Sequence, residues 1–98
     1  MDIKKMTKIF KALSNENRLE IYLEIVKNSE QSYDANNECF ISEILDALKI
    51  GAPTISHHLK ELSNAELIFT EKRGKFLVAR VNEELVGEVF DAMKRKRY

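Results

Sequence analysis

Two short helical segments separated by a tight turn constrain the fold more than any other feature of this chain. In the first, apolar residues recur at helical spacing between Phe40 and Leu48. The turn Lys49-Ile50-Gly51-Ala52 follows, and Pro53 suits the first turn of a second helix, where its missing amide hydrogen has no intrahelical partner. Such a Gly-containing turn is typical of two helices set across each other. We therefore expect a helix pair here, its second helix spanning roughly residues 53–63.

The second helix of this pair divides into an apolar and a polar side. Ile55, Leu59 and Leu62 recur at helical spacing and are expected to point inward. The adjacent His57 and His58 lie about 100° apart on a helix, so they do not suit one metal ion, and a role facing DNA or partly in the core is expected. The residues left toward solvent or a partner are Thr54, Ser56, His57, Lys60 and Glu61.

The rest of the chain predicts three more helices and a hairpin. Apolar residues at three- and four-residue steps indicate helices over residues 3–13, 16–27 and, after an Asn82 cap, 83–93. Ser14 or Asn15 can cap the second of these, and the polar stretch 29–38 is expected to be a loop. Extended runs at 68–72 and 75–81 flank Arg73-Gly74, which is a hairpin signal. The expected fold is mainly α with a small β-hairpin, in the order ααααββα.

Length and charge narrow the function classes. At 98 residues the chain is expected to form one domain over 1–98, and it leaves little room for an enzyme pocket. Sixteen basic and sixteen acidic residues balance to zero, which weakens electrostatic capture of DNA. The charges are nevertheless segregated, because residues 29–48 hold five acids and no base whereas basic residues gather in the hairpin. The basic hairpin residues are Lys72, Arg73, Lys75 and Arg80.

Cysteine content and hydropathy point to a cytoplasmic protein. The single cysteine, Cys39, cannot form an internal disulfide, which agrees with a reducing compartment. The apolar stretches are too short to span a membrane, and the N-terminus has no apolar signal core. We expect no membrane partner.

Five sequence runs form a recognisable set. They are Lys11-Ala12-Leu13-Ser14, Arg18-Leu19-Glu20-Ile21, the run from Ile55 to Leu62 reading Ile-Ser-His-His-Leu-Lys-Glu-Leu, Ala65-Glu66-Leu67-Ile68, and the Arg73-Gly74-Lys75 hairpin. Together they resemble the ArsR/SmtB family of winged helix-turn-helix repressors, over about residues 6–93. The resemblance implies a homodimer joined through the first and last helices that reads double-stranded DNA at a two-fold operator.

The family motif also assigns DNA-binding roles. Thr54, Ser56 and His57 fall at groove-facing positions, and Lys60, Lys72, Arg73 and Lys75 lie near phosphates. Pro53, which begins the helix, is also counted among the DNA-binding residues. Base contacts set sequence choice, whereas phosphate contacts set affinity and register. Ala52 stands where many relatives carry Gln or Ser, so this chain lacks an amide that could read adenine and can instead meet a thymine methyl.

The metal sites of the family are not matched. The third-helix site uses a Cys-x-Cys pair, which aligns with Phe40 and Ser42, and the last-helix zinc positions hold Asn82, Glu84, Arg95 and Tyr98. Zinc and softer metals need Cys and His ligands in fixed geometry. We expect no metal and no cofactor, and the inducer is left unassigned.

Cys39 leaves an alternative open. Beside Phe40 it suits a small core residue, although its place at a loop-helix boundary could lower its thiol pKa and make it a redox sensor. The chain could thus be a metal- or redox-responsive repressor using Cys39.

The other alternative is a winged-helix protein-interaction module, favoured by the zero net charge. An enzyme pairing Cys39 with His57 or His58 lacks a third orienting group.

Overall fold

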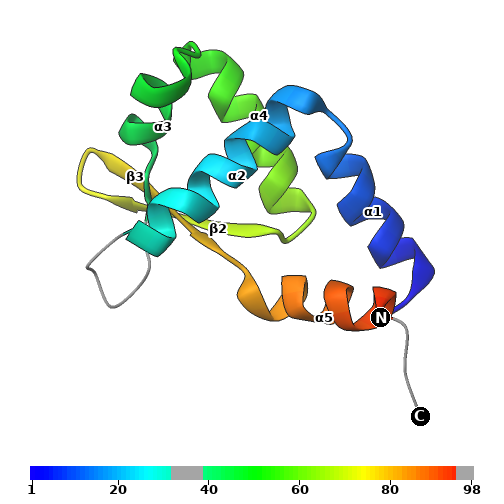
Figure 1. Cartoon of the computed structure of the whole chain (residues 1–98). Helices are drawn as coiled ribbons and strands as arrows, with labels where there is room; N and C mark the ends of the chain where they lie inside the picture. The colour runs from blue at the N-terminus through cyan, green and yellow to red at the C-terminus, as the bar shows by residue number, and fades with distance from the viewer. Residues whose placement is uncertain (32–38, 95–98) are drawn as a thin grey trace.

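Five helices and a small antiparallel sheet make up the computed structural model, which describes residues 1–31 and 39–94. The hairpin projects at one side of the molecule, and the first and last helices lie at the other (Figure 1). The order of helices and hairpin is the predicted one, with one short strand in addition. The elements are α1 (Ile3–Leu13), α2 (Glu16–Gln31), β1 (Cys39–Phe40), α3 (Ile41–Leu48), α4 (Ala52–Asn64), β2 (Ile68–Arg73), β3 (Phe76–Val81) and α5 (Glu83–Met93).

Side-chain caps fix where three helices begin. Oδ1 of Asp2 accepts from the Lys5 amide at 2.7 Å to begin α1, and Oδ1 of Asn15 accepts from the Arg18 amide at 3.0 Å at the start of α2. The predicted Asn82 cap is confirmed, since its side chain accepts from the Leu85 amide at 3.2 Å. Each cap satisfies an amide that has no partner within its own helix.

The second helix is longer than predicted. The apolar pattern predicts it over 16–27 with a loop from residue 29, but the backbone stays helical to Gln31. Ser29, near the end of the helix, is buried although the sequence there is polar. The remainder of the predicted loop, residues 32–38, lies outside the described residues.

The third helix begins one residue later than predicted, because the short strand β1 precedes it. Phe40 was expected inside that helix, but its backbone is extended, with φ −76° and ψ 127°, and α3 begins at Ile41. Cys39 pairs with Ala79 and Phe40 with Val78, so β1 becomes the third strand of a sheet ordered β1-β3-β2. Because the partners of this strand lie far along the chain, no local pattern of apolar residues marks it. The sequence alone therefore did not predict it.

The hairpin places its turn one residue later than the predicted Arg73-Gly74. Arg73 ends β2 and pairs with Phe76, so Gly74 and Lys75 form the two-residue turn. Gly74 has a φ of 62°, which side chains rarely tolerate and which a tight hairpin turn of this kind requires.

The core lies between α2, α4 and one face of the sheet. Ile55, Leu59 and Leu62 of α4 are buried there, as predicted, together with Ile21 and Ile25 of α2. Burying apolar side chains of this size stabilises the fold by roughly 1.5 to 3 kcal/mol each. α4 is thereby held rigidly with its polar side outward.

Candidate nucleic-acid interface

The exposed side of α4 carries the predicted base-reading residues. Thr54, Ser56, His57 and Lys60 are exposed, and Pro53 lies in the first turn. Gly51 precedes the helix in an extended conformation, with Ile55 N–H donating to its carbonyl at 3.1 Å. The helix thus presents four polar side chains on the surface opposite its buried apolar stripe.

A groove joins this helix to the hairpin. Ser56 and Lys60 of α4 line it together with Thr70 of β2 and Leu77 of β3, and its volume is about 310 Å³. Two of the predicted helix residues, Ser56 and Lys60, therefore share one groove with the hairpin. The cations at the hairpin tip do not line this groove.

The hairpin tip, which we call the wing, holds the predicted phosphate-contacting cations. Lys72 and Arg73 lie in β2 and Lys75 in the turn, and all three are exposed. Nη2 of Arg73 lies 3.7 Å from a carboxylate oxygen of Glu71, and Nζ of Lys75 lies 5.6 Å from the ring centroid of Phe76. Both of these contacts are exposed, so solvent screens them.

Aromatic rings pack near both ends of the hairpin, Phe76 beside the turn and Phe69 toward the other end. Phe40 of β1 meets Phe76 of β3 edge to face, with centroids 5.8 Å apart and an interplanar angle of 83°. The guanidinium carbon of Arg80 lies 5.7 Å from the ring centroid of Phe69 on the same hairpin. β1 therefore ties the wing to the start of α3, a role for Phe40 that sequence reasoning missed.

The histidine pair divides between the surface and the core. His57 is exposed, whereas His58 is only 6% exposed. Nδ1 of His58 accepts a hydrogen bond of 3.3 Å from Nε of Arg18, and Nη1 of Arg18 donates to the Ala12 carbonyl at 3.3 Å. Arg18 thus connects α1, α2 and α4. The sequence offered Arg18 only as part of the family motif, because its partner lies forty residues away.

The contacts of His58 favour its neutral form. Burial, then the Arg18 guanidinium and then His57 lower the pKa of His58. An Arg side chain can only donate, so Nδ1 must be the unprotonated acceptor and the ring proton resides on Nε2. His58 therefore positions α4 against α2.

Cys39 is a core residue in this structure. It is 1% exposed, and its Sγ donates to the Phe40 carbonyl at 3.6 Å. Burial, followed by the charges of Glu43 and Glu24, raises the pKa of the thiol to about 12. The suggestion that a loop-helix boundary lowers this pKa is wrong, because the strand β1 carries the sulfur into the apolar interior.

Within residues 1–31 and 39–94, no three His, Cys, Asp or Glu side chains gather as a metal site would require. At the positions aligned with the family's thiol pair, Phe40 and Ser42 are both exposed. The acidic run 34–38 lies outside the described residues.

Two helices expose apolar side chains. Ile3 is 77% and Phe10 43% exposed on α1, while Phe90 and Met93 of α5 are 61% and 62% exposed. Ile9, on the same helix as Ile3 and Phe10, is instead buried in the core of its own chain. The described helices include none long and apolar enough to span a membrane.

Comparisons with known proteins agree with this arrangement. The family model described as bacterial regulatory protein, arsR family, matches residues 35–69. An uncharacterized HTH-type transcriptional regulator of Bacillus subtilis, YbzH, is 37% identical over 93 positions, covering 88% of this chain and 92% of the relative. The arsenical resistance operon repressor of Staphylococcus xylosus is 31% identical, covering 91% of this chain and 77% of the relative.

Solved structures show the same fold. An ArsR-like transcriptional regulator from Rhodococcus sp. RHA1 superimposes with a TM-score of 0.74 at 21% identity, over 92% of this chain and 76% of that one. A homodimeric winged helix-turn-helix DNA-binding domain from Mycobacterium bovis gives 0.67 at 21% identity, over 98% and 87%. The fold is a winged helix-turn-helix, and the chain belongs to the ArsR family of transcriptional regulators.

Proposed function

We propose that this protein is a homodimeric, sequence-specific DNA-binding repressor. The observation that carries the proposal is the division of α4 into a buried apolar stripe and an exposed polar side beside the hairpin groove. The family and the printed repressor function of the Staphylococcus xylosus relative support it. The proposal treats residues 1–98 as one non-catalytic, cytoplasmic domain.

In this proposal α4 enters the major groove. Thr54, Ser56 and His57 contact base edges, with Pro53 holding the start of the helix near the DNA. Lys60 and the wing cations Lys72, Arg73 and Lys75 contact phosphates. Phosphate contacts supply affinity for any sequence, so the choice of operator rests on the three α4 side chains.

The dimer forms through α1 and α5. Ile3, Phe10, Phe90 and Met93 expose apolar surface that a second copy would remove from water. The Mycobacterium bovis neighbour is described as homodimeric, and a two-fold pair of recognition helices reads half-sites about one helical turn apart.

In this proposal, the signal that releases the protein from DNA is not a metal ion bound at the third-helix or last-helix site of the family. Those positions lack thiol and imidazole ligands, and Cys39 is held as a buried thiol. We propose no cofactor. A winged-helix interaction module is the alternative that the functional test must separate.

The test is selection from a random double-stranded DNA library followed by titration of the enriched sequence. The repressor proposal predicts a two-fold symmetric sequence, bound by two chains, with affinity falling steeply as salt rises. Enrichment of no sequence, together with failure to be retained on DNA at low salt, would instead support the interaction module.

A further inference from the structure

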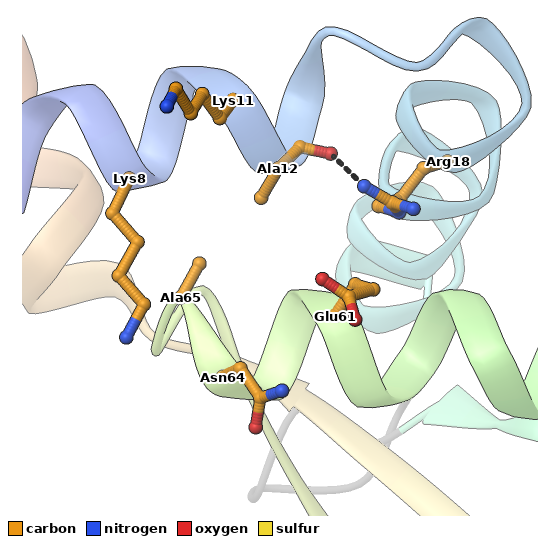
Figure 2. A pocket seen from close by; sticks show the side chains of 7 residues that line it. All are labelled: Lys8, Lys11, Ala12, Arg18, Glu61, Asn64 and Ala65. Carbon is orange, nitrogen blue, oxygen red and sulfur yellow. Dashed lines mark hydrogen bonds between the residues drawn. The ribbon is translucent and has the colours of Figure 1, made fainter.

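A second pocket adjoins the groove between α4 and the hairpin, and Asn64 lines both. It has a volume of about 360 Å³ and is formed where α1, the start of α2 and the end of α4 meet (Figure 2). This volume falls within the range of roughly 300 to 1,000 Å³ that small-molecule sites occupy. Its lining residues are Lys8, Lys11, Ala12, Arg18, Glu61, Asn64 and Ala65.

The pocket has an apolar floor and a cationic wall. Ala12 and Ala65 are 7% and 4% exposed, so their methyl groups are packed against the core. Figure 2 shows Lys8 extending from α1 toward the end of α4, and Glu61 rising from α4 on the side of Arg18. Three cationic side chains and one carboxylate line the pocket, so the net charge of its lining is positive.

No described carboxylate forms an ion pair with Arg18. Arg18 is half-buried, and its two hydrogen-bond acceptors, the Ala12 carbonyl and Nδ1 of His58, are both uncharged. Among residues 1–31 and 39–94, no carboxylate forms an ion pair with Arg18, Lys8 or Lys11. A partly desolvated guanidinium without a counter-ion is stabilised by an anion, and its geometry suits a carboxylate or phosphate.

The proposed dimer leaves this pocket open. At about 100° per residue, Lys8 lies roughly 140° around α1 from Ile3 and Lys11 about 100° from Phe10. The apolar surface that would join two copies is therefore on another face of the helix.

We propose that this pocket binds a small organic anion, held through its carboxylate or phosphate oxygens by Arg18, Lys8 and Lys11. Its apolar part rests on Ala12 and Ala65. Glu61 and Asn64 accept hydrogen bonds from donor groups of the ligand. The site does not require DNA binding, so it can be tested on the protein alone.

The test is nuclear magnetic resonance titration of the ¹⁵N-labelled protein at constant ionic strength. Inorganic phosphate and succinate are the probes, and chloride is the control. Saturable shifts are expected at the amides of Lys11, Ala12, Arg18 and Ala65, and the tighter of the two probes identifies the preferred oxyanion. Chloride should give no saturation.

Two charge-matched variants make the test specific. Lys8→Gln with Lys11→Gln should weaken probe binding about tenfold, because charge-assisted hydrogen bonds are removed. Lys4→Gln with Lys27→Gln removes the same charge from positions outside the pocket and should leave binding within about twofold. The spectra themselves report whether each variant is folded.

Absence of saturation with both probes, or an equal reduction of binding in both variants, would overturn the proposal. The proposal would also be overturned if neither probe saturated the shifts and the Lys8/Lys11 variant lowered the salt slope of DNA binding. In that case the two lysines would contact the DNA backbone, and the proposed repressor function would stand without the anion site.

Discussion

Nε of Arg18 donates a 3.3 Å hydrogen bond to Nδ1 of His58, joining the second helix to the buried side of the helix that exposes the candidate DNA-reading residues. The same guanidinium donates through Nη1 to the carbonyl of Ala12. One side chain thus fixes the relative positions of α1, α2 and α4. The orientation of α4 depends on this contact as well as on its apolar stripe.

Arg18→Ala should lower the free energy of unfolding by about 1 to 3 kcal/mol, because a buried imidazole nitrogen and a carbonyl are left without their donor. Arg18→Lys should recover little, since an ammonium cannot reproduce the fork of donors. Urea denaturation at one fixed protein concentration measures both. Lys27→Ala, a change on the same helix away from this hydrogen bond, is the control, and an equal effect there would contradict the role of Arg18.

Acidification should destabilise the fold through His58. Its pKa is lowered in the folded state from the ordinary value of 6.5, so below about pH 6.5 the unfolded chain binds more protons than the native one. The free energy of unfolding therefore falls as the pH drops through 6.5 and stops falling only below the lowered pKa. Denaturation midpoints between pH 7.5 and 5 measure this.

His58→Gln should flatten that pH dependence, because glutamine keeps an acceptor for Arg18 but does not titrate. His57→Gln, on the exposed side of α4, is the matched control and should keep most of the decline of stability in acid, because burial and Arg18 lower the pKa of His58 more than His57 does. If the His58 and His57 variants kept the same slope, another group would be responsible.

Cys39 should resist alkylation in the folded protein. A buried thiol with a pKa of about 12 has almost no thiolate at neutral pH, and the thiolate is the reactive form. Iodoacetamide at pH 7.5 should modify it slowly in buffer and rapidly in denaturant, as mass spectrometry would show. Fast modification of the native protein would revive the redox alternative.

The predicted dimer can be disrupted at one exposed ring. Phe90 of α5 is 61% exposed, so Phe90→Glu should not affect the chain's own core, yet it places a charge in the proposed interface. Sedimentation at micromolar concentration should give twice the chain mass for the unmodified protein and the single mass for the variant. Phe69→Glu on the hairpin, where Phe69 is 49% exposed, should remain dimeric.

The sequence predicted the features that depend on neighbouring residues and missed those that depend on contacts between residues far apart in the chain. The helix spanning Ala52–Asn64 and the Asn82 cap depend on neighbours within one or two turns, so periodicity and capping chemistry predicted them. The strand at Cys39, the contact between Arg18 and His58, and the burial of Ile9 depend on residues far along the chain. The spacing of apolar residues cannot show which of two apolar faces meets the core and which stays exposed.

The candidate site divides in the same way. Exposure of Thr54, Ser56 and His57 follows from the helical period once the buried stripe is known, so their positions were predictable. The bracing of the wing by Phe40 and Phe76 was not, because it needs the register of β1 against β3. The proposed contacts of α4 and the wing with bases and phosphates are tested only by binding measurements.

The DNA-binding proposal predicts that α4 and wing substitutions fail in different ways. His57→Ala should cost roughly 1 to 3 kcal/mol at the selected operator and relax its sequence preference, since the variant cannot reach the base edge while its phosphate-binding cations are intact. Binding to random DNA should barely change. The measurement is fluorescence anisotropy with operator and random duplexes across a salt series.

Arg73→Ala should weaken binding to both duplexes alike and lower the salt slope by about one for each phosphate that the arginine neutralises in each subunit. Glu71→Gln is its matched control, because it removes the nearby carboxylate and keeps the cation, so the affinity for both duplexes should hold or rise. If His57→Ala and Arg73→Ala both left operator affinity and salt dependence unchanged, α4 and the wing would not face DNA. The exposed polar side of α4 would then be the binding surface of an interaction module.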